Sequence, residues 1–161
     1  MSTSEATAFR GVLLHVCIAE AGSQPMQELT EARLVAGVGI DGDRYATGKG
    51  YYSKLPRADR QVTLIEIETL EAIRRDHRIP IEPQETRRNL TTRGVPLNHL
   101  VGRRFRVGAV VLNGERLNVP CKYLDGLLGR ELFGPLTNRS GLNCTIVTGG
   151  VIRPGDPIEP L

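Results

Sequence analysis

Glycine and proline recur at short intervals along the whole chain. The 161 residues include 18 glycines and 10 prolines, and neither type is gathered in one tract. Both residues interrupt regular elements, so this distribution predicts many turns and short elements and disfavours an all-helical bundle or a flexible linker. A chain of this length can bury roughly two thirds of its unfolded surface, so we expect a single domain over residues 1–161, with no disulfide or metal staple.

Apolar runs between these turns have the length and pattern of strands. The strand candidates are Arg10–Glu20, Glu31–Gly37, Arg60–Ile65, Leu97–Leu112 and Gly141–Thr148. Asn113-Gly114 is a hairpin signal, whereas Tyr45–Asp59 and the polar segment Glu85–Gly94 have no apolar periodicity.

Two segments have helical spacing. They are Glu66–His77 and Cys121–Phe133, the second with a stripe of Leu124, Leu127, Leu128 and Leu132. Seven or so short strands with two helices predict a mostly β protein, a barrel or sandwich with helical excursions.

Arginine supplies nearly all the positive charge. Only three of the 21 basic residues are lysines, and the net charge is +3. A guanidinium fork fits phosphate and carboxylate with two hydrogen bonds, although a coding bias would also enrich arginine. The small net charge, with 4% aromatic residues and no Trp, argues against a nucleic-acid-binding protein.

Nothing in the sequence indicates export or a membrane. No apolar run approaches the ~18 residues of a spanning helix, and the N-terminus lacks a basic segment followed by an apolar run. The three cysteines form no CxxC pair, so we expect reduced thiols and a cytoplasmic protein without membrane contact. We interpret Cys17 and Cys144 as buried structural thiols and His15 as a satisfied core imidazole, with a ligand pair of His15 and Cys17 as the alternative.

Cys121 carries the strongest chemical signal. It follows Pro120 and begins a predicted helix, so its sulfur lies near unsatisfied amides that favour a thiolate. Lys122 adds a neighbouring positive charge. Such a thiolate can attack as a nucleophile, hold a sulfane sulfur as a persulfide or bind a soft metal. The alternative is an unreactive cysteine packed at a helix start.

Arginines in polar turns form a second candidate site. These residues are Arg87, Arg88, Asn89, Thr91, Thr92 and Arg93, with Arg44, Arg60 and Arg139 in other turns. Guanidinium groups beside exposed amides form a phosphate cradle, and a solvated charged surface is the alternative. GIDGDRY, at Gly39–Tyr45, lacks the spacing of a P-loop or dinucleotide motif. Within it, Asp41 and Asp43 form a possible acidic pair, although a turn-capping aspartate is commoner.

Several motifs occur in a characteristic order: GIDGDRY, RQVTLIE, TRRNLTTRG, LVGRRFRVG, Pro120-Cys121 and RSGLNCTIVTGGVIRPGD. This order resembles that of the MOSC family, named after the C-terminal domain of molybdenum cofactor sulfurases, over about residues 11–158. The resemblance implies a β-barrel-like MOSC fold with a few short helices. It also implies a molybdenum cofactor held as a phosphorylated pterin, and a key cysteine that carries sulfur or faces the metal.

The matching motifs indicate the site residues. Cys121 is the implied catalytic residue and metal ligand. The resemblance and the phosphate cradle together predict cofactor binding by Asp43, Arg44, Arg60, Arg88, Asn89, Thr91, Lys122, Arg139 and Gly141. Tyr45 stands where many relatives have histidine, so the resemblance carries no proton-transfer role to it.

Three functions follow from these features. The first is a sulfur relay through a Cys121 persulfide to a metal–sulfur centre, which would make the protein a sulfur carrier or transferase. The second is a molybdenum-dependent reductase of N-hydroxylated compounds with Cys121 as metal ligand. The third is a non-catalytic module that binds RNA or another anion. The sequence shows no pyridoxal phosphate domain, so we expect a cysteine desulfurase or other sulfur donor, and a molybdoenzyme acceptor or redox partner.

Overall fold

The computed structural model describes residues 8–53 and 58–161. Residues 1–7, and residues 54–57 of the expected loop Tyr45–Asp59, lie outside the described part. Within it the strands are β1 (Gly11–Ile18), β2 (Gln27–Leu29), β3 (Ala32–Val35), β4 (Gly39–Ile40), β5 (Val62–Glu66), β6 (Leu90–Arg93), β7 (Arg104–Val107), β8 (Val110–Leu117), β9 (Leu142–Thr148), β10 (Gly150–Ile152) and β11 (Pro157–Pro160). The helices are α1 (Ile67–His77) and α2 (Lys122–Leu128), with short 3-10 turns at Ala58–Arg60, Pro83–Thr86 and Leu97–Leu100.

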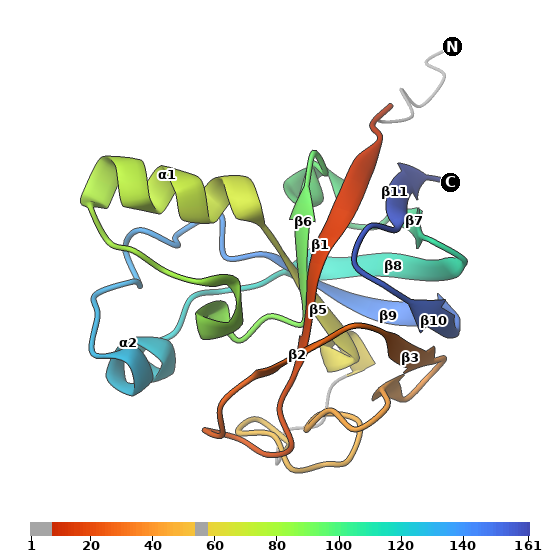
Figure 1. Cartoon of the computed structure of the whole chain (residues 1–161), viewed down its shortest axis with the longest axis horizontal. Helices are drawn as coiled ribbons and strands as arrows, with labels where there is room; N and C mark the ends of the chain where they lie inside the picture. The colour runs from red at the N-terminus through yellow and green to blue at the C-terminus, as the bar shows by residue number, and fades with distance from the viewer. Residues whose placement is uncertain (1–7, 54–57) are drawn as a thin grey trace.

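Seven strands close into a barrel (Figure 1). They lie in the order β11-β7-β8-β9-β5-β6-β1, and β11 also pairs with β1, which removes the free edges. β5 and β6 are parallel, and the other ladders are antiparallel. β2 extends the sheet beyond β1, and β10, β3 and β4 form a separate small sheet. The predicted mostly β, barrel-like fold is confirmed.

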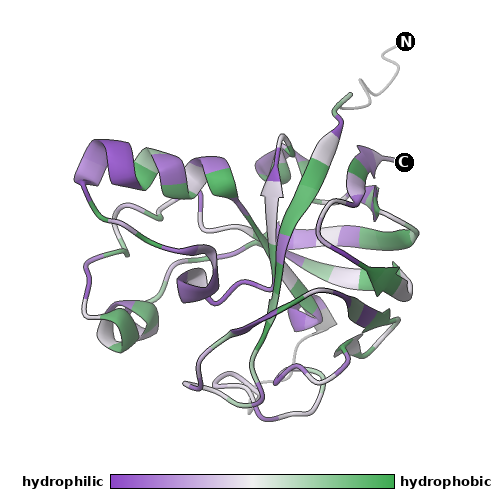
Figure 2. Ribbon diagram, in the orientation of Figure 1, coloured by the Kyte–Doolittle hydropathy of each residue, from purple (hydrophilic) through white to green (hydrophobic). Residues whose placement is uncertain are grey.

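Alternation along β5 separates two apolar cores. Leu64 packs in the barrel core, whereas the adjacent Ile65 packs with Ile73 of α1 and Leu124 of α2. Successive side chains of a strand point to opposite faces, so one strand contributes to both cores. Both helices therefore lie on the same side of the barrel, and α1 carries both hydrophilic and hydrophobic residues along its length (Figures 1 and 2).

The hairpin predicted at Asn113-Gly114 is wrong, because both residues lie inside β8. The β7–β8 turn instead contains Gly108, whose φ is 56°. Gly114 lies at a register shift between β8 and β9, and the Leu100 carbonyl occupies the place that a Cβ would need. Gly114 therefore lets the Leu100 backbone approach β8 closely at a bulge, and it does not form a turn.

Three further expectations need correction. Residues of Glu85–Gly94 form the central strand β6, where Thr92 is fully buried in spite of the polar sequence. The second helix ends at Leu128 because Gly129 adopts a left-handed conformation with φ 65°, which leaves Leu132 beyond it. His15 is partly exposed and bonded to Glu28, so it is not a core imidazole.

We predict opposite effects for two Gly→Ala changes. Gly114→Ala forces a methyl group against the Leu100 carbonyl and should destabilise the protein by about 1–3 kcal/mol. Gly126 lies inside α2 with no neighbouring atoms around its missing Cβ, so Gly126→Ala should stabilise by about 0.5–1 kcal/mol. Urea unfolding of both variants measures these changes, and a stabilising Gly114→Ala would contradict the close approach.

Candidate functional site

A cavity of about 260 Å³ lies beside the start of α2. Its lining residues come from loops and strand ends that are far apart in sequence: Arg44, Tyr45, Tyr51, Tyr52, Arg60, Thr63, Arg87, Arg88, Arg116, Asn118, Val119, Pro120, Cys121, Tyr123, Leu124 and Asn143. Five arginines and one cysteine are among them, and no Asp or Glu in the described part of the chain lines the cavity. The cavity is therefore suited to an anion.

Cys121 is the N-cap residue of α2 and has an extended backbone, with φ −137° and ψ 152°. Its side chain is half-buried. The Tyr52 hydroxyl donates a hydrogen bond to Cys121 Sγ, with an O–S distance of 2.9 Å. Burial is the main cause of a raised pKa of Tyr52, and this hydrogen bond is the second cause. The phenol therefore keeps its proton at neutral pH. Tyr52 therefore remains a donor toward the sulfur.

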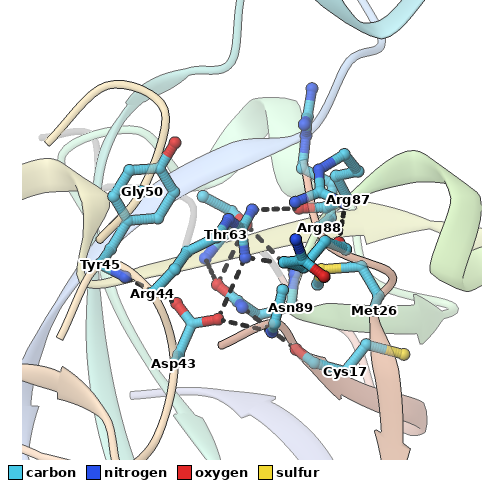
Figure 3. A network of polar contacts seen from close by, with 12 residues as sticks. Cys17, Met26, Asp43, Arg44, Tyr45, Gly50, Thr63, Arg87, Arg88 and Asn89 are labelled. Atoms are coloured by element: carbon cyan, nitrogen blue, oxygen red, sulfur yellow. Dashed lines mark hydrogen bonds and ion pairs between the residues drawn. The ribbon is translucent and has the colours of Figure 1, made fainter. Parts of the chain in front are cut away.

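A buried ion pair holds the first cavity arginine (Figure 3). Asp43 is completely buried, and its Oδ1 accepts a hydrogen bond from Arg44 Nη1 at 3.0 Å. The Asp43 carboxylate also accepts from the backbone amides of Ala19 and Tyr45. The second bond spans two residues, so Asp43 also caps its own turn, as the sequence indicates. Arg44 Nη2 donates to the Arg87 carbonyl at 3.1 Å, which ties two cavity arginines together.

Asn89 links two strands next to the cavity, β5 and β1. Its Oδ1 accepts from the Thr63 amide at 3.1 Å, and its Nδ2 donates to the Cys17 carbonyl at 3.1 Å. These bonds join β5 to β1 at the point where β6 begins. They hold the preceding residues, Arg87 and Arg88, against the cavity.

Arg88 is held by neutral acceptors. Its Nε donates to the Ser140 carbonyl at 2.9 Å, and its Nη2 donates to Asn118 Oδ1 at 2.5 Å. Burial, together with the positive charge of Arg44, lowers the pKa of Arg88 to about 10, which leaves it charged at neutral pH. Gly141 has φ 108° and lies against the Leu64 carbonyl, and a Cβ there would approach Arg88 Nε. Glycine at position 141 therefore allows the close approach of the Leu64 carbonyl, which a Cβ would block.

Arg87 is 7% exposed. Its Nη1 donates to the Gln24 carbonyl at 2.6 Å, whereas its Nη2 is buried without a hydrogen-bond partner among the described residues. Burial is the main cause of a lowered pKa of Arg87, and the positive charge of Arg44 is the second cause. A buried donor without an acceptor costs free energy, so an incoming acceptor beside Arg87 would be favourable.

All four tyrosines of the chain line the cavity. The rings of Tyr51 and Tyr123 are stacked with centroids 4.0 Å apart, and Tyr52 meets Tyr51 edge to face at 4.8 Å. The Arg60 guanidinium lies over the Tyr52 ring, 5.1 Å from its centroid. The cavity thus combines cations with aromatic surface, an environment in which a planar anion can stack and pair.

The structure brings together part of the predicted site. Arg44, Arg60, Arg88 and Cys121 line the cavity, whereas Asp43, Asn89 and Gly141 support these residues without lining it.

Three predicted binding residues do not line the cavity. Thr91 is buried in β6, Lys122 places its Nζ 5.6 Å from the Phe133 ring centroid, and Arg139 donates to the Pro135 carbonyl. The predicted site residues also leave out Arg87, Arg116 and the four tyrosines. Arg87 belonged to the recognised arginine segment, but no sequence signal indicates the convergence of the tyrosines.

The described residues contain neither a metal-ligand cluster nor a membrane-spanning helix. No group of three or more His, Cys, Asp or Glu side chains in the described ranges is arranged to hold a metal ion. No helix in that part of the chain is long and apolar enough to cross a membrane. A metal in the cavity would therefore depend on Cys121 and on ligands from a bound group, since Cys121 is the cysteine that lines it.

Comparison with known proteins identifies the family. The model of the MOSC domain matches residues 40–159. The chain belongs to the MOSC domain family. This membership supports a role related to the molybdenum cofactor. No curated protein matches the chain.

Several solved structures share the fold. The YuaD protein from Bacillus subtilis superposes with a TM-score of 0.80 at 21% identity, covering 95% of this chain and 96% of that one. YiiM from Geobacillus stearothermophilus gives 0.73 at 14% identity, covering 94% and 75%. YiiM from Escherichia coli gives 0.66 at 16% identity, covering 96% and 70%. At these identities the likeness shows the fold.

We predict that loss of the buried carboxylate is costly. Asp43→Asn leaves Arg44 buried without its counter-charge and should destabilise the protein by about 3–5 kcal/mol. The matched control is Glu159→Gln, which removes the exposed partner of Arg10 and should cost about 0–1 kcal/mol. Chemical unfolding measures both, and similar small losses would contradict a structural role of the Asp43 pair.

We also predict selective alkylation of one thiol. Burial raises the pKa of Cys17 to about 11, and it raises the pKa of Cys144 well above its ordinary value, so both thiols are protonated and shielded at pH 8. Iodoacetamide added to the folded protein should therefore label Cys121 first. Peptide mass spectrometry locates the label, and modification of Cys144 before Cys121 would contradict the assignment.

Proposed function

We propose that this MOSC protein binds the molybdenum cofactor and relays sulfur, as a persulfide on Cys121, to a metal–sulfur centre. The observation that carries the proposal is the position of Cys121 on a cavity lined by five arginines and no carboxylate of the described chain. A thiol near several positive charges is the environment in which a sulfur anion is stabilised. The MOSC family match supports the connection with molybdenum.

The residues present fit a phosphorylated pterin. Arg44, Arg60 and Arg88 would hold the phosphate, and the unpartnered Nη2 of Arg87 would gain an acceptor. The tyrosine rings would pack against the planar pterin. The Cys121 thiolate is a soft ligand, which suits the metal. When bound, the cofactor supplies a sulfur-binding molybdenum atom as the acceptor.

The protein's own residues perform the first half of the relay. The Cys121 thiolate attacks the outer sulfur of a donor, the donor's S–S bond breaks, and its electron pair leaves with the donor's inner sulfur. Cys121 then holds a persulfide, with the Tyr52 hydroxyl as a hydrogen-bond donor beside its Sγ. We propose a cysteine desulfurase or another sulfur donor upstream, and a molybdoenzyme or redox partner downstream.

Mass spectrometry after loading with sulfur tests the relay. The reduced protein is incubated with inorganic polysulfide, and bound sulfane sulfur is measured on the intact chain. We expect Cys121→Ser to lose the added sulfur, because its hydroxyl cannot form a persulfide. Cys17→Ser is the matched control and should keep it, since Cys17 is buried. Equal loading of wild type and Cys121→Ser would overturn the proposal.

The same variant separates the relay from the second candidate function. Cys121 is the cysteine that lines the cavity, which also places it where a single metal ligand would be needed. After expression in a host that makes the cofactor, molybdenum content is measured with reduction of an N-hydroxylated compound. Joint loss of molybdenum and reductase activity in Cys121→Ser, without any persulfide on the wild type, would favour the reductase.

A further inference from the structure

We propose that the sulfur donor of this protein is a small dianion with a terminal sulfane sulfur, of the thiosulfate class, which Arg87 and Arg88 bind next to Cys121. The inference rests on the proposed persulfide function and names the donor for it. It replaces a docked protein donor with an anion that enters the cavity before the cofactor does, because the same arginines would hold the cofactor's phosphate.

Arg87 and Arg88 differ in their partners from two other arginines that line the cavity, Arg44 and Arg116. Arg44 is paired with Asp43, and Arg116 Nε contacts Asp59 Oδ2 at 2.6 Å. The hydrogen bonds of Arg88 go to carbonyl, amide and hydroxyl oxygens, and the hydrogen bond of Arg87 goes to the Gln24 carbonyl. Within residues 8–53 and 58–161, neither Arg87 nor Arg88 has a carboxylate partner. A dianion would balance these two charges.

Arg87 provides the second observation. The residue is 93% buried, it lines the cavity, and its Nη2 has no acceptor in the described part of the chain. Buried guanidinium donors are normally satisfied, so a missing acceptor here points to a ligand. An oxyanion accepts from several N–H groups at once, which a neutral disulfide or trisulfide does not do.

The size of the cavity favours a small donor. It measures about 260 Å³, and its sulfur is partly enclosed and hydrogen-bonded by Tyr52. Thiosulfate fits such a space with its oxygens on the arginines and its outer sulfur toward Cys121. A persulfide on another protein would have to bring a chain segment into the same space.

The transfer balances without an added oxidant or reductant. The Cys121 thiolate attacks the outer sulfur of thiosulfate and forms a new S–S bond. The original bond between the outer sulfur and the central sulfur breaks, and its electron pair leaves with sulfite. Cys121 ends as a persulfide anion, and the released sulfite carries away the two negative charges that thiosulfate brought.

The test compares an anionic donor with a neutral one. The reduced protein is incubated separately with thiosulfate and with a neutral dialkyl trisulfide. The persulfide formed on Cys121 from thiosulfate, the mixed disulfide or trisulfide formed on Cys121 from the dialkyl trisulfide, and the released sulfite are measured. Wild type should load from both and release one sulfite per persulfide formed from thiosulfate. Arg87→Met should slow loading from thiosulfate by about tenfold or more and leave loading from the trisulfide within about twofold. Arg139→Gln, which removes an arginine outside the cavity lining, should slow neither.

A second measurement does not depend on a variant that folds. Sulfate, compared with chloride at equal ionic strength, should inhibit loading of the wild type from thiosulfate and leave the trisulfide reaction unchanged. Loading from the trisulfide but not from thiosulfate would overturn the donor assignment and leave the persulfide relay intact. Loading from neither donor would overturn both. Equal slowing of both reactions in Arg87→Met, or no sulfate inhibition, would also overturn the donor assignment.

Discussion

The buried ion pair between Asp43 and Arg44 is the interaction on which the site depends. Removing two charges from water is unfavourable unless every remaining polar group is satisfied. Asp43 meets this condition by accepting from Arg44 and from the amides of Ala19 and Tyr45. Arg44 in turn donates to the Arg87 carbonyl. The pair therefore fastens the loop after β4 to the end of β1 and to the turn before β6, and it holds one wall of the cavity in place.

The barrel supplies the rigid frame for these loops. Its seven strands close through the β1–β11 pairing, and alternation on β5 sends Leu64 into the barrel and Ile65 toward the helices. α2 packs on the second core through Leu124, which places its N-cap residue, Cys121, beside the arginines. Loops on the surface of a closed barrel can carry polar groups whose burial in the barrel interior would cost free energy. The chemistry therefore gathers at strand ends and at a helix start.

Prediction from the sequence succeeded where a local pattern reflected burial. It failed where contacts with segments distant in sequence determined the structure. β1, β5 and β9 were predicted because their apolar runs are short and bounded by turn residues. β6 was missed because Thr91 and Thr92 are polar, although neighbouring strands satisfy the backbone and bury them. Asn113-Gly114 reads as a turn, but the Leu100 carbonyl makes Gly114 part of a bulge. Cys121 was selected by its local position, whereas the convergence of Tyr45, Tyr51, Tyr52 and Tyr123 had no local signal.

Sequence patterns alone predict a mostly β protein that is rich in arginine and has one cysteine between a preceding proline and a following helix. These properties are local, because they depend on spacing, turn residues and side-chain chemistry within a few positions. The folded chain shows which arginines line the cavity with Cys121: Arg87 does, and Arg139 does not. The physical reason is that burial and hydrogen-bond satisfaction depend on segments brought together by barrel closure, and no single segment contains that information.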